Sequence, residues 1–224
     1  SSQPTFAELA RIAGDAHVAG IMTGKAGVVH FHLGDGDRGL ELIERLLDET
    51  EIPPRVLNPT HCNRRKVLFD EACELTRRGC SIDVTAFPAG DNADEYSAAE
   101  SFRRFKKKGL DMTKLTISSD GGGCLPQFNK QGELIHLDYG RCTLLSETLK
   151  ELLDEGFDTA QVISVFTSNV ASLLKLGQKG EITVGKDADF VILDDHNRIE
   201  SVMALGQWHQ QNYETTQFGG FEKK

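Results

Sequence analysis

The sequence lacks the features that would place it in a membrane, in a secretory pathway or in a disulfide-stabilised class. No apolar run approaches the roughly 18 residues that a membrane-spanning helix needs. The five cysteines include no C-x-x-C pair, and an odd number suits free thiols in a reducing compartment better than a disulfide framework. No secretory signal peptide opens the chain. We therefore expect a cytoplasmic protein.

Basic residues are also in deficit. The chain has 25 Lys and Arg against 34 Asp and Glu, a net charge of −9. A nucleic-acid groove or an anionic membrane surface would require the opposite balance, so we expect neither partner. With 224 residues, 39% of them hydrophobic and 26% charged, the chain can bury a core of ordinary globular size.

Along most of the chain, short β-type runs alternate with amphipathic helical patterns. This order predicts an α/β fold with parallel strands and right-handed crossovers. Asp37 is expected to cap the second helix, and the third strand should alternate apolar and polar faces. We expect helices at 4–20, 37–50, 67–78, up to 108, 142–155 and, as two short ones, up to 176; strands at 27–32, 55–60, 80–87 and 114–119; a loop at 88–94; and an irregular segment at 124–140.

The alternation of strand and helix patterns stops after about residue 177, and only β-type stretches follow. The stretches 180–194 and 199–206 resemble strands of a small β module, and a polar, poorly ordered tail should follow from about 210. We divide the chain into residues 1–177, 178–210 and 211–224.

Three of the predicted strands end in residues that can carry chemistry. His32 closes the first strand, His61 the second, and Asp120 the fourth, where three glycines follow it. These positions are one β/α unit and then two units apart. Because the carboxyl ends of parallel strands share one edge of a sheet or one mouth of a barrel, the three side chains should converge.

Each of the three taken singly could be no more than a polar strand end. Together, two imidazoles and a carboxylate make a ligand set that suits Zn²⁺ or a similar ion. His32, His61 and Asp120 are therefore our candidate metal ligands. We expect His30 to turn away from them and to pack or support a ligand.

Two further residues are candidates for binding a substrate. Arg64 faces the same mouth, where a fixed guanidinium would bind a carboxylate with two hydrogen bonds, although an exposed surface arginine is an equal alternative. Cys124 follows Asp120 closely and either lines the pocket or is an inert small residue. The basic residues 103–108 are interpreted as a solvated helix end.

One motif points elsewhere and is set aside. Residues 34–39 match G-x-G-x-x-G between a strand and a helix, the pattern of dinucleotide sites. Asp35 and Asp37 would occupy the place of the pyrophosphate, and the next strand ends in His61 instead of the acid that binds a ribose.

Four motifs in this order resemble the amidohydrolase superfamily and, within it, the isoaspartyl (β-aspartyl) dipeptidases. They are Val-Val-His-Phe-His-Leu-Gly-Asp at 28–35, Asn-Pro-Thr-His-Cys-Asn-Arg at 58–64, Leu-Thr-Ile-Ser-Ser-Asp-Gly at 115–121 and Lys-Gly-Glu-Ile-Thr-Val-Gly-Lys-Asp-Ala-Asp-Phe-Val-Ile-Leu at 179–193. The resemblance covers nearly the whole chain and fades in the tail.

The resemblance implies a (β/α)₈ TIM-type barrel of the metal-dependent hydrolase kind, with a small β-sandwich domain and two zinc ions at the carboxyl end. By position, His32 and His61 would hold one zinc, while Asp120 would ligate the other and act as general base. Arg64 would bind a carboxylate of the dipeptide. Cys124 falls where the family has a serine that contacts substrate, and a thiol is a poorer hydrogen-bond partner.

Half of the expected site has no counterpart in this sequence. The family's first-strand His-x-His pair and the carboxylated lysine that bridges its metals would lie before Ser1. The chain thus resembles the C-terminal half of the barrel, and we expect a fragment or one half of a split molecule. Such a chain would form a homo-oligomer or be complemented by the missing N-terminal half.

The function implied is zinc-dependent hydrolysis of β-aspartyl dipeptides by a metal-bound hydroxide. Another amidohydrolase activity, such as that of a dihydroorotase, a hydantoinase or a deaminase, would use similar ligands. A non-catalytic barrel that has lost its metal is the third alternative.

Overall fold

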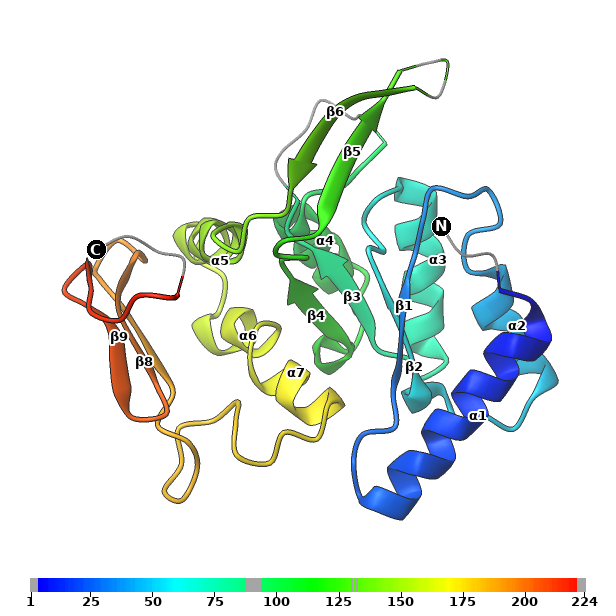
Figure 1. The fold of residues 1–224 in the computed structure, drawn as a ribbon, viewed down its shortest axis with the longest axis horizontal. Coiled ribbons are helices and arrows are strands. Elements are labelled where there is room, and N and C mark those ends of the chain that lie inside the picture. The colour runs from blue at the N-terminus through cyan, green and yellow to red at the C-terminus, as the bar shows by residue number, and fades with distance from the viewer. Residues whose placement is uncertain (1–3, 88–93, 130, 132, 221–224) are drawn as a thin grey trace.

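A computed structural model describes residues 4–87, 94–129, 131 and 133–220 of the chain (Figure 1). Its first part alternates strands with helices, as the sequence predicts. The strands pair in parallel, β1 (Val29–His32) with β2 (Leu57–Thr60) and β3 (Ile82–Thr85) with β4 (Leu115–Ser118). The helices are α1 (Phe6–Thr23), α2 (Glu41–Glu49), α3 (Lys66–Arg77), α4 (Ala98–Lys107), α5 (Leu144–Asp154), α6 (Thr159–Ser164) and α7 (Ser168–Leu173), with 3-10 turns η1 (Pro54–Val56) and η2 (Met112–Lys114).

Three of the α-helices, α1, α4 and α6, begin at a residue whose side chain accepts a hydrogen bond from a free backbone N–H group. Thr5 and Glu8 form a reciprocal capping box at the start of α1, and Gly24 ends that helix in the left-handed region. The Asp158 side chain accepts a hydrogen bond from the Gln161 N–H at the start of α6.

The predicted cap of α2 is wrong. Leu40 precedes this helix, and no side chain of its own segment caps it. Glu71 of α3 accepts a hydrogen bond from the Leu40 N–H instead, at 3.2 Å. A neighbouring helix therefore does what we expected of Asp37.

β2 and β3 are not joined by a ladder of backbone hydrogen bonds, so the four strands form two separate parallel pairs. We call the boundary between β2 and β3 the seam. Single hydrogen bonds, from a side chain and from the backbone, cross this boundary. Asn58 Nδ2 donates to the Ser81 carbonyl at 3.0 Å, and the Cys62 N–H donates to the Asp83 carbonyl at 3.2 Å. Pro59, which has no N–H, lies between them in sequence.

The core lies between the strands and the helices that follow them. Phe69, Phe102 and Phe105 are fully buried on α3 and α4. The predicted alternation of apolar and polar residues holds on β3, but all four residues are buried, so the polar face is covered as well as the apolar one. Strands of a parallel arrangement are covered on both faces, which explains this burial. Cys62, Cys73 and Cys80 are buried, Cys124 and Cys142 are exposed, and all five are free.

The segment that we expected to be irregular forms a hairpin. Strands β5 (Cys124–Phe128) and β6 (Leu134–Tyr139) pair antiparallel and project from the body of the molecule (Figure 1). The predicted loop at 88–94 lies outside the described residues, except for Asp94.

The C-terminal part forms a four-stranded antiparallel sheet in the order β10-β9-β8-β7. It consists of β7 (Phe190–Leu193), β8 (Ile199–Ala204), β9 (Gln207–Gln211) and β10 (Glu214–Thr215). The sheet thus continues into residues that we assigned to the polar tail, while the division into domains stays a prediction. Among the described residues, no helix combines the length and the apolar character needed to cross a bilayer.

Candidate metal centre

The three predicted ligands lie at the carboxyl ends of three strands. His32 is the last residue of β1, His61 follows β2 directly, and Asp120 lies two residues beyond β4. One ligand atom of each lies within 4.8 Å of those of the other two. The tertiary structure therefore brings together residues that are far apart in the sequence.

The two imidazoles approach each other most closely. His32 Nδ1 lies 3.0 Å from His61 Nε2, and His61 Nε2 lies 4.0 Å from Asp120 Oδ2. The His32 side chain is exposed, His61 is buried and Asp120 is half-buried. The cluster thus opens to solvent on the side of β1.

The electronic state of His61 suits a ligand. Burial lowers its pKa to about 4, against the opposing charge of Asp120, so the ring is neutral at pH 7. His61 Nδ1 lies 2.8 Å from Thr85 Oγ1 on β3. With the proton assigned to Nδ1 and donated to this hydroxyl, Nε2 presents its lone pair toward His32 and Asp120.

Both residues that follow strand ends have an unusual backbone. His61 has φ 63° and Asp120 has φ 48°, in the left-handed region that residues other than glycine rarely adopt. Such conformations persist only where the surroundings hold them, and they concentrate at functional sites. This strain is an independent sign that the two positions matter.

Glycines shape the turn that carries Asp120. The Gly123 N–H donates to the Asp120 carbonyl at 2.8 Å, the Gly122 N–H donates to the Gly140 carbonyl at 2.9 Å, and the Gly140 N–H donates to the Gly123 carbonyl at 2.8 Å. A β-carbon on Gly123 would lie 2.7 Å from Asp120 Cγ. The carboxylate therefore rests directly against a glycine α-carbon.

Our expectation that His30 turns away from His32 is wrong, whereas its role in packing or in supporting a ligand stays a prediction. His30 and His32 are two residues apart on one strand and share a face, with ring centroids 5.1 Å apart. His30 Nδ1 lies 2.7 Å from Asn58 Oδ1 on β2. His30 thus extends the polar face below the cluster.

Part of the Arg64 guanidinium already pairs with Asp35, which lies in the loop after β1. Its Nε and Nη2 donate to the two carboxylate oxygens of Asp35, at 3.0 and 3.1 Å. Asp35 follows β1 in the loop after His32. The guanidinium is therefore oriented, and its role in binding substrate stays a prediction.

Cys124 and the basic helix end differ in how they are placed. Cys124 is exposed at the base of the projecting hairpin, opposite Tyr139, and its contact with substrate stays a prediction. Arg103 is not merely solvated, because it pairs with Glu100, Glu151 and Glu155.

Asp83 on β3 was missed by the sequence reasoning. It is only 3% exposed, and its carboxylate accepts hydrogen bonds from Thr60, Thr116 and Ser118. The available signal was an acid between Ile82 and Val84 in a strand of the parallel sheet, where both faces are covered.

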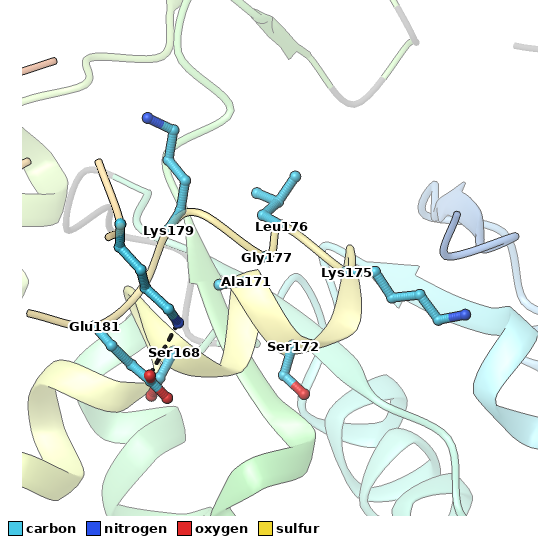
Figure 2. A pocket seen from close by; sticks show the side chains of 9 residues that line it. Ser168, Ala171, Ser172, Lys175, Leu176, Gly177, Lys179 and Glu181 are labelled. Atoms are coloured by element: carbon cyan, nitrogen blue, oxygen red, sulfur yellow. Dashed lines mark hydrogen bonds and ion pairs between the residues drawn. The ribbon is translucent and has the colours of Figure 1, made fainter. Parts of the chain in front are cut away.

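Two cavities lie away from the cluster. One of about 340 Å³ is bounded by α7 and the loop after it, where Glu181 pairs with Lys186 (Figure 2). The other, of about 460 Å³, is lined by Arg55, Ser81 and Lys114 at the amino ends of the strands. Neither includes His32, His61 or Asp120, so neither bears on the proposed chemistry.

The donor set fits a zinc ion. Two nitrogens that each lie about 2.0–2.1 Å from a tetrahedral zinc are separated by roughly 3.3 Å, close to the spacing of the His32 and His61 nitrogens. The neutral imidazole of His61 and the carboxylate of Asp120 are ligand types that Zn²⁺ accepts. The more distant Asp120 oxygen allows either the same ion or a neighbouring one.

Two solved structures match almost the entire chain. The β-aspartyl dipeptidase of the keratin-degrading thermophile Fervidobacterium islandicum AW-1, in complex with a β-Asp-Leu dipeptide, is 37% identical with a TM-score of 0.89 over 99% of this chain and 58% of its own. A second structure of that enzyme is 35% identical, with a TM-score of 0.83 over 99% of this chain and 56% of its own. The chain thus spans less than two thirds of the length of these proteins.

A more distant solved structure agrees in fold, and a curated protein matches part of the sequence. An adenosine deaminase of Xanthomonas campestris with bound zinc is 16% identical with a TM-score of 0.57, covering 96% of this chain and 51% of its own. The allantoinase of Desulfitobacterium hafniense is 33% identical over 86 residues, which are 36% of this chain and 19% of that protein. The family model described as "Amidohydrolase family" matches residues 7–220, and we conclude that the chain belongs to the amidohydrolase family.

Proposed function

We propose that this chain provides part of the active site of a zinc-dependent hydrolase that cleaves β-aspartyl dipeptides. The observation that carries the proposal is the convergence of His32, His61 and Asp120 at one end of the strands. The similarity to the β-aspartyl dipeptidase structures supports the choice of substrate.

Each of the three residues would have a defined task. His32 and His61 would hold a metal through the two nitrogens that face each other. When bound, the metal supplies Lewis-acid chemistry, lowering the pKa of water and polarising a carbonyl oxygen. Asp120 would accept a proton from the attacking water and transfer it to the leaving amine as the amide C–N bond breaks.

Arg64 would recognise a carboxylate of the dipeptide. Asp35 uses the Nε and Nη2 edge of the guanidinium. The remaining edge is formed by Nη1 and the second N–H of Nη2, and a substrate carboxylate would accept two hydrogen bonds from it.

The rest of the site would come from residues that precede this sequence in a longer protein. We propose that they complete a (β/α)₈ barrel beside β1 and carry further ligands, including a carboxylated lysine, and that β7–β10 belong to a small β-sandwich. The similar structures are longer than this chain. His30 and His32 also form an exposed face on β1, as an unfinished barrel interior would.

The decisive experiment is Asp120→Asn in the full-length protein, assayed with β-aspartyl dipeptides. We expect turnover to fall by at least a thousandfold, because the amide cannot accept the proton, while zinc content stays near that of the wild type. Zinc is measured by atomic emission on the same sample. An active variant, or a wild-type protein without metal, would contradict the proposal.

A second candidate is another amidohydrolase activity. The allantoinase match favours it, although it covers only 86 residues. Parallel assays with β-aspartyl dipeptides and with cyclic imides separate the two candidates, because a carboxylate-binding arginine favours the dipeptide. A folded full-length protein that contains no zinc would favour the non-catalytic alternative.

A further inference from the structure

Asp83 is a buried carboxylate to which the proposed chemistry assigns no role. Its Oδ2 accepts hydrogen bonds from Thr60 Oγ1 and Ser118 Oγ, both at 2.6 Å, and its Oδ1 accepts one from Thr116 Oγ1 at 2.7 Å. Burial raises its pKa, and the hydroxyl donors oppose that effect. Three hydroxyl donors satisfy this buried carboxylate, so it belongs to a connected hydrogen-bond network.

The donors belong to the strands that carry two of the candidate ligands. Thr60 immediately precedes His61, and Ser118 lies two residues before Asp120. On the other side of His61, the Cys62 N–H donates to the Asp83 carbonyl at 3.2 Å. One residue of β3 thus tethers both neighbours of His61 and the strand end that leads to Asp120.

The division of the sheet gives these contacts a role that a backbone ladder would otherwise have. β2 and β3 share no ladder, so core packing and single hydrogen bonds, those of Asp83 and the two between Asn63 and Thr85 among them, hold the two parallel pairs together. His61 belongs to one pair and Asp120 to the other. Both have left-handed backbone conformations, which relax unless neighbouring groups hold them.

We propose that Asp83 is a positioning residue that fixes His61 and Asp120 relative to each other across the seam between the two strand pairs. Its carboxylate acts through Thr60 and Ser118, whereas the bond from the Cys62 N–H goes to its backbone carbonyl and does not depend on the side chain. This inference deepens the proposed function, because the geometry it protects is that of the proposed metal centre.

Asp83→Asn in the full-length protein tests the proposal. The side chain keeps its size, but one carboxylate oxygen becomes an NH₂ group that cannot accept from a hydroxyl. We expect zinc affinity, measured by competition with a chromophoric chelator, to fall about 10–100-fold, as for other residues that orient ligands. The absorption spectrum of the cobalt-substituted protein should change as well.

The control is a buried polar residue at the other end of β4. Asn169 Nδ2 donates to the Met112 and Leu115 carbonyls at 2.7 and 2.8 Å. Asn169→Ser should lower the thermal midpoint without changing zinc affinity or the cobalt spectrum. Equal losses of zinc affinity in the two variants, or wild-type affinity in Asp83→Asn, would overturn the proposal.

Two further measurements keep the test decisive. If Asp83→Asn does not fold, Thr60→Val, which removes one donor at constant size, should lower zinc affinity in the same direction, and unchanged affinity would count against Asp83. In metal-free protein, Asp83→Asn should speed amide hydrogen exchange at 60–63 and 117–121, whereas Asn169→Ser should not. A wild-type protein that binds no metal contradicts the proposed function, while the exchange result still decides the role of Asp83.

Discussion

At the scale of single residues, the candidate site depends on glycines beside Asp120, because they have no side chain to displace it. The Asp120 carboxylate lies against Gly123, and Gly140 packs against the Asp120 carbonyl. Any side chain at these positions would displace the turn. The glycines are therefore part of how the carboxylate is aimed.

Gly123→Ala should impair function more than stability. A β-carbon there would lie 2.7 Å from Asp120 Cγ, so the carboxylate must move, whereas the backbone of Gly123 does not have a positive φ. A displacement of about 1 Å can reduce turnover on the order of 100-fold. We expect such a loss of kcat with a nearly unchanged thermal midpoint.

Gly34→Ala is the matched control for this prediction. Gly34 lies in the loop after β1 at the same mouth, and a β-carbon there would meet no atom within 4 Å. This variant should keep wild-type kcat. A Gly123→Ala protein that is equally active would show that Asp120 is not held by the glycine turn.

Arg64→Met should separate substrate binding from metal binding. If the guanidinium binds a substrate carboxylate, its loss should raise KM about tenfold or more and leave zinc content unchanged. Arg38→Met serves as control, because Arg38 pairs with Glu41 on the surface. Steady-state kinetics with a β-aspartyl dipeptide decide the matter, and a wild-type KM in Arg64→Met would assign Arg64 to the surface.

At the scale of elements, charge pairs join helices that the chain connects only distantly. Arg103 of α4 donates to Glu155 at 2.8 Å, just beyond α5, and it also pairs with Glu100 and Glu151. A guanidinium shared by three carboxylates is a network, which stabilises more than an isolated surface pair. The α4–α5 contact should therefore depend on this residue.

Arg103→Met should lower the free energy of unfolding by about 1 kcal/mol at neutral pH, measured by urea denaturation. Hydrogen bonding from Arg103 holds the pKa of Glu155 below its usual value. The stabilisation by this pair is therefore present above the unfolded pKa of glutamate and is lost as pH falls through the lower, folded pKa. The difference between variant and wild type should shrink below about pH 4.

Arg11→Met is the control at this scale. Arg11 is 84% exposed, and its pair with Asp15 spans 3.9 Å. It should change stability by less than about 0.5 kcal/mol. Equal effects of the two substitutions would argue against an organised network between α4 and α5.

At the scale of the whole molecule, β1 pairs with β2 alone among the described residues, so its other edge has no strand beside it, and His30 and His32 are exposed on it. An unpaired strand edge is a surface that proteins normally cover. In the barrel that we propose, preceding residues would lie there. This would explain why His32 is the most exposed of the three candidate ligands.

A longer protein that includes preceding residues should protect β1. We expect slower amide hydrogen exchange at residues 29–32 and a higher thermal midpoint than in residues 1–224 alone, because the strand gains a partner. The exchange of β8, inside the C-terminal sheet, serves as the internal control. Unchanged exchange at β1 would contradict the proposed barrel.

The sequence by itself determined the alternation of strands and helices and the placing of His32, His61 and Asp120 at strand ends. These follow from local patterns, because periodicity and turn residues act over a few neighbouring positions. It also supported the family, since the motifs are continuous stretches. The hairpin of β5 and β6 escaped prediction because its strands show no clear burial pattern: β6 is exposed along its whole length.

Only the tertiary structure decided how the strand ends meet. Arg64 pairs with Asp35, and Asp83 binds Thr60 and Ser118. These partners are about 20 to 35 positions apart in the sequence, and the hydrogen bond from Thr60 to Asp83 crosses the seam between β2 and β3. No local pattern encodes such partners, because burial and hydrogen bonding at these positions depend on which strands become neighbours. The ligand types could thus be read from the chain, whereas the support that aims them became visible only in the fold.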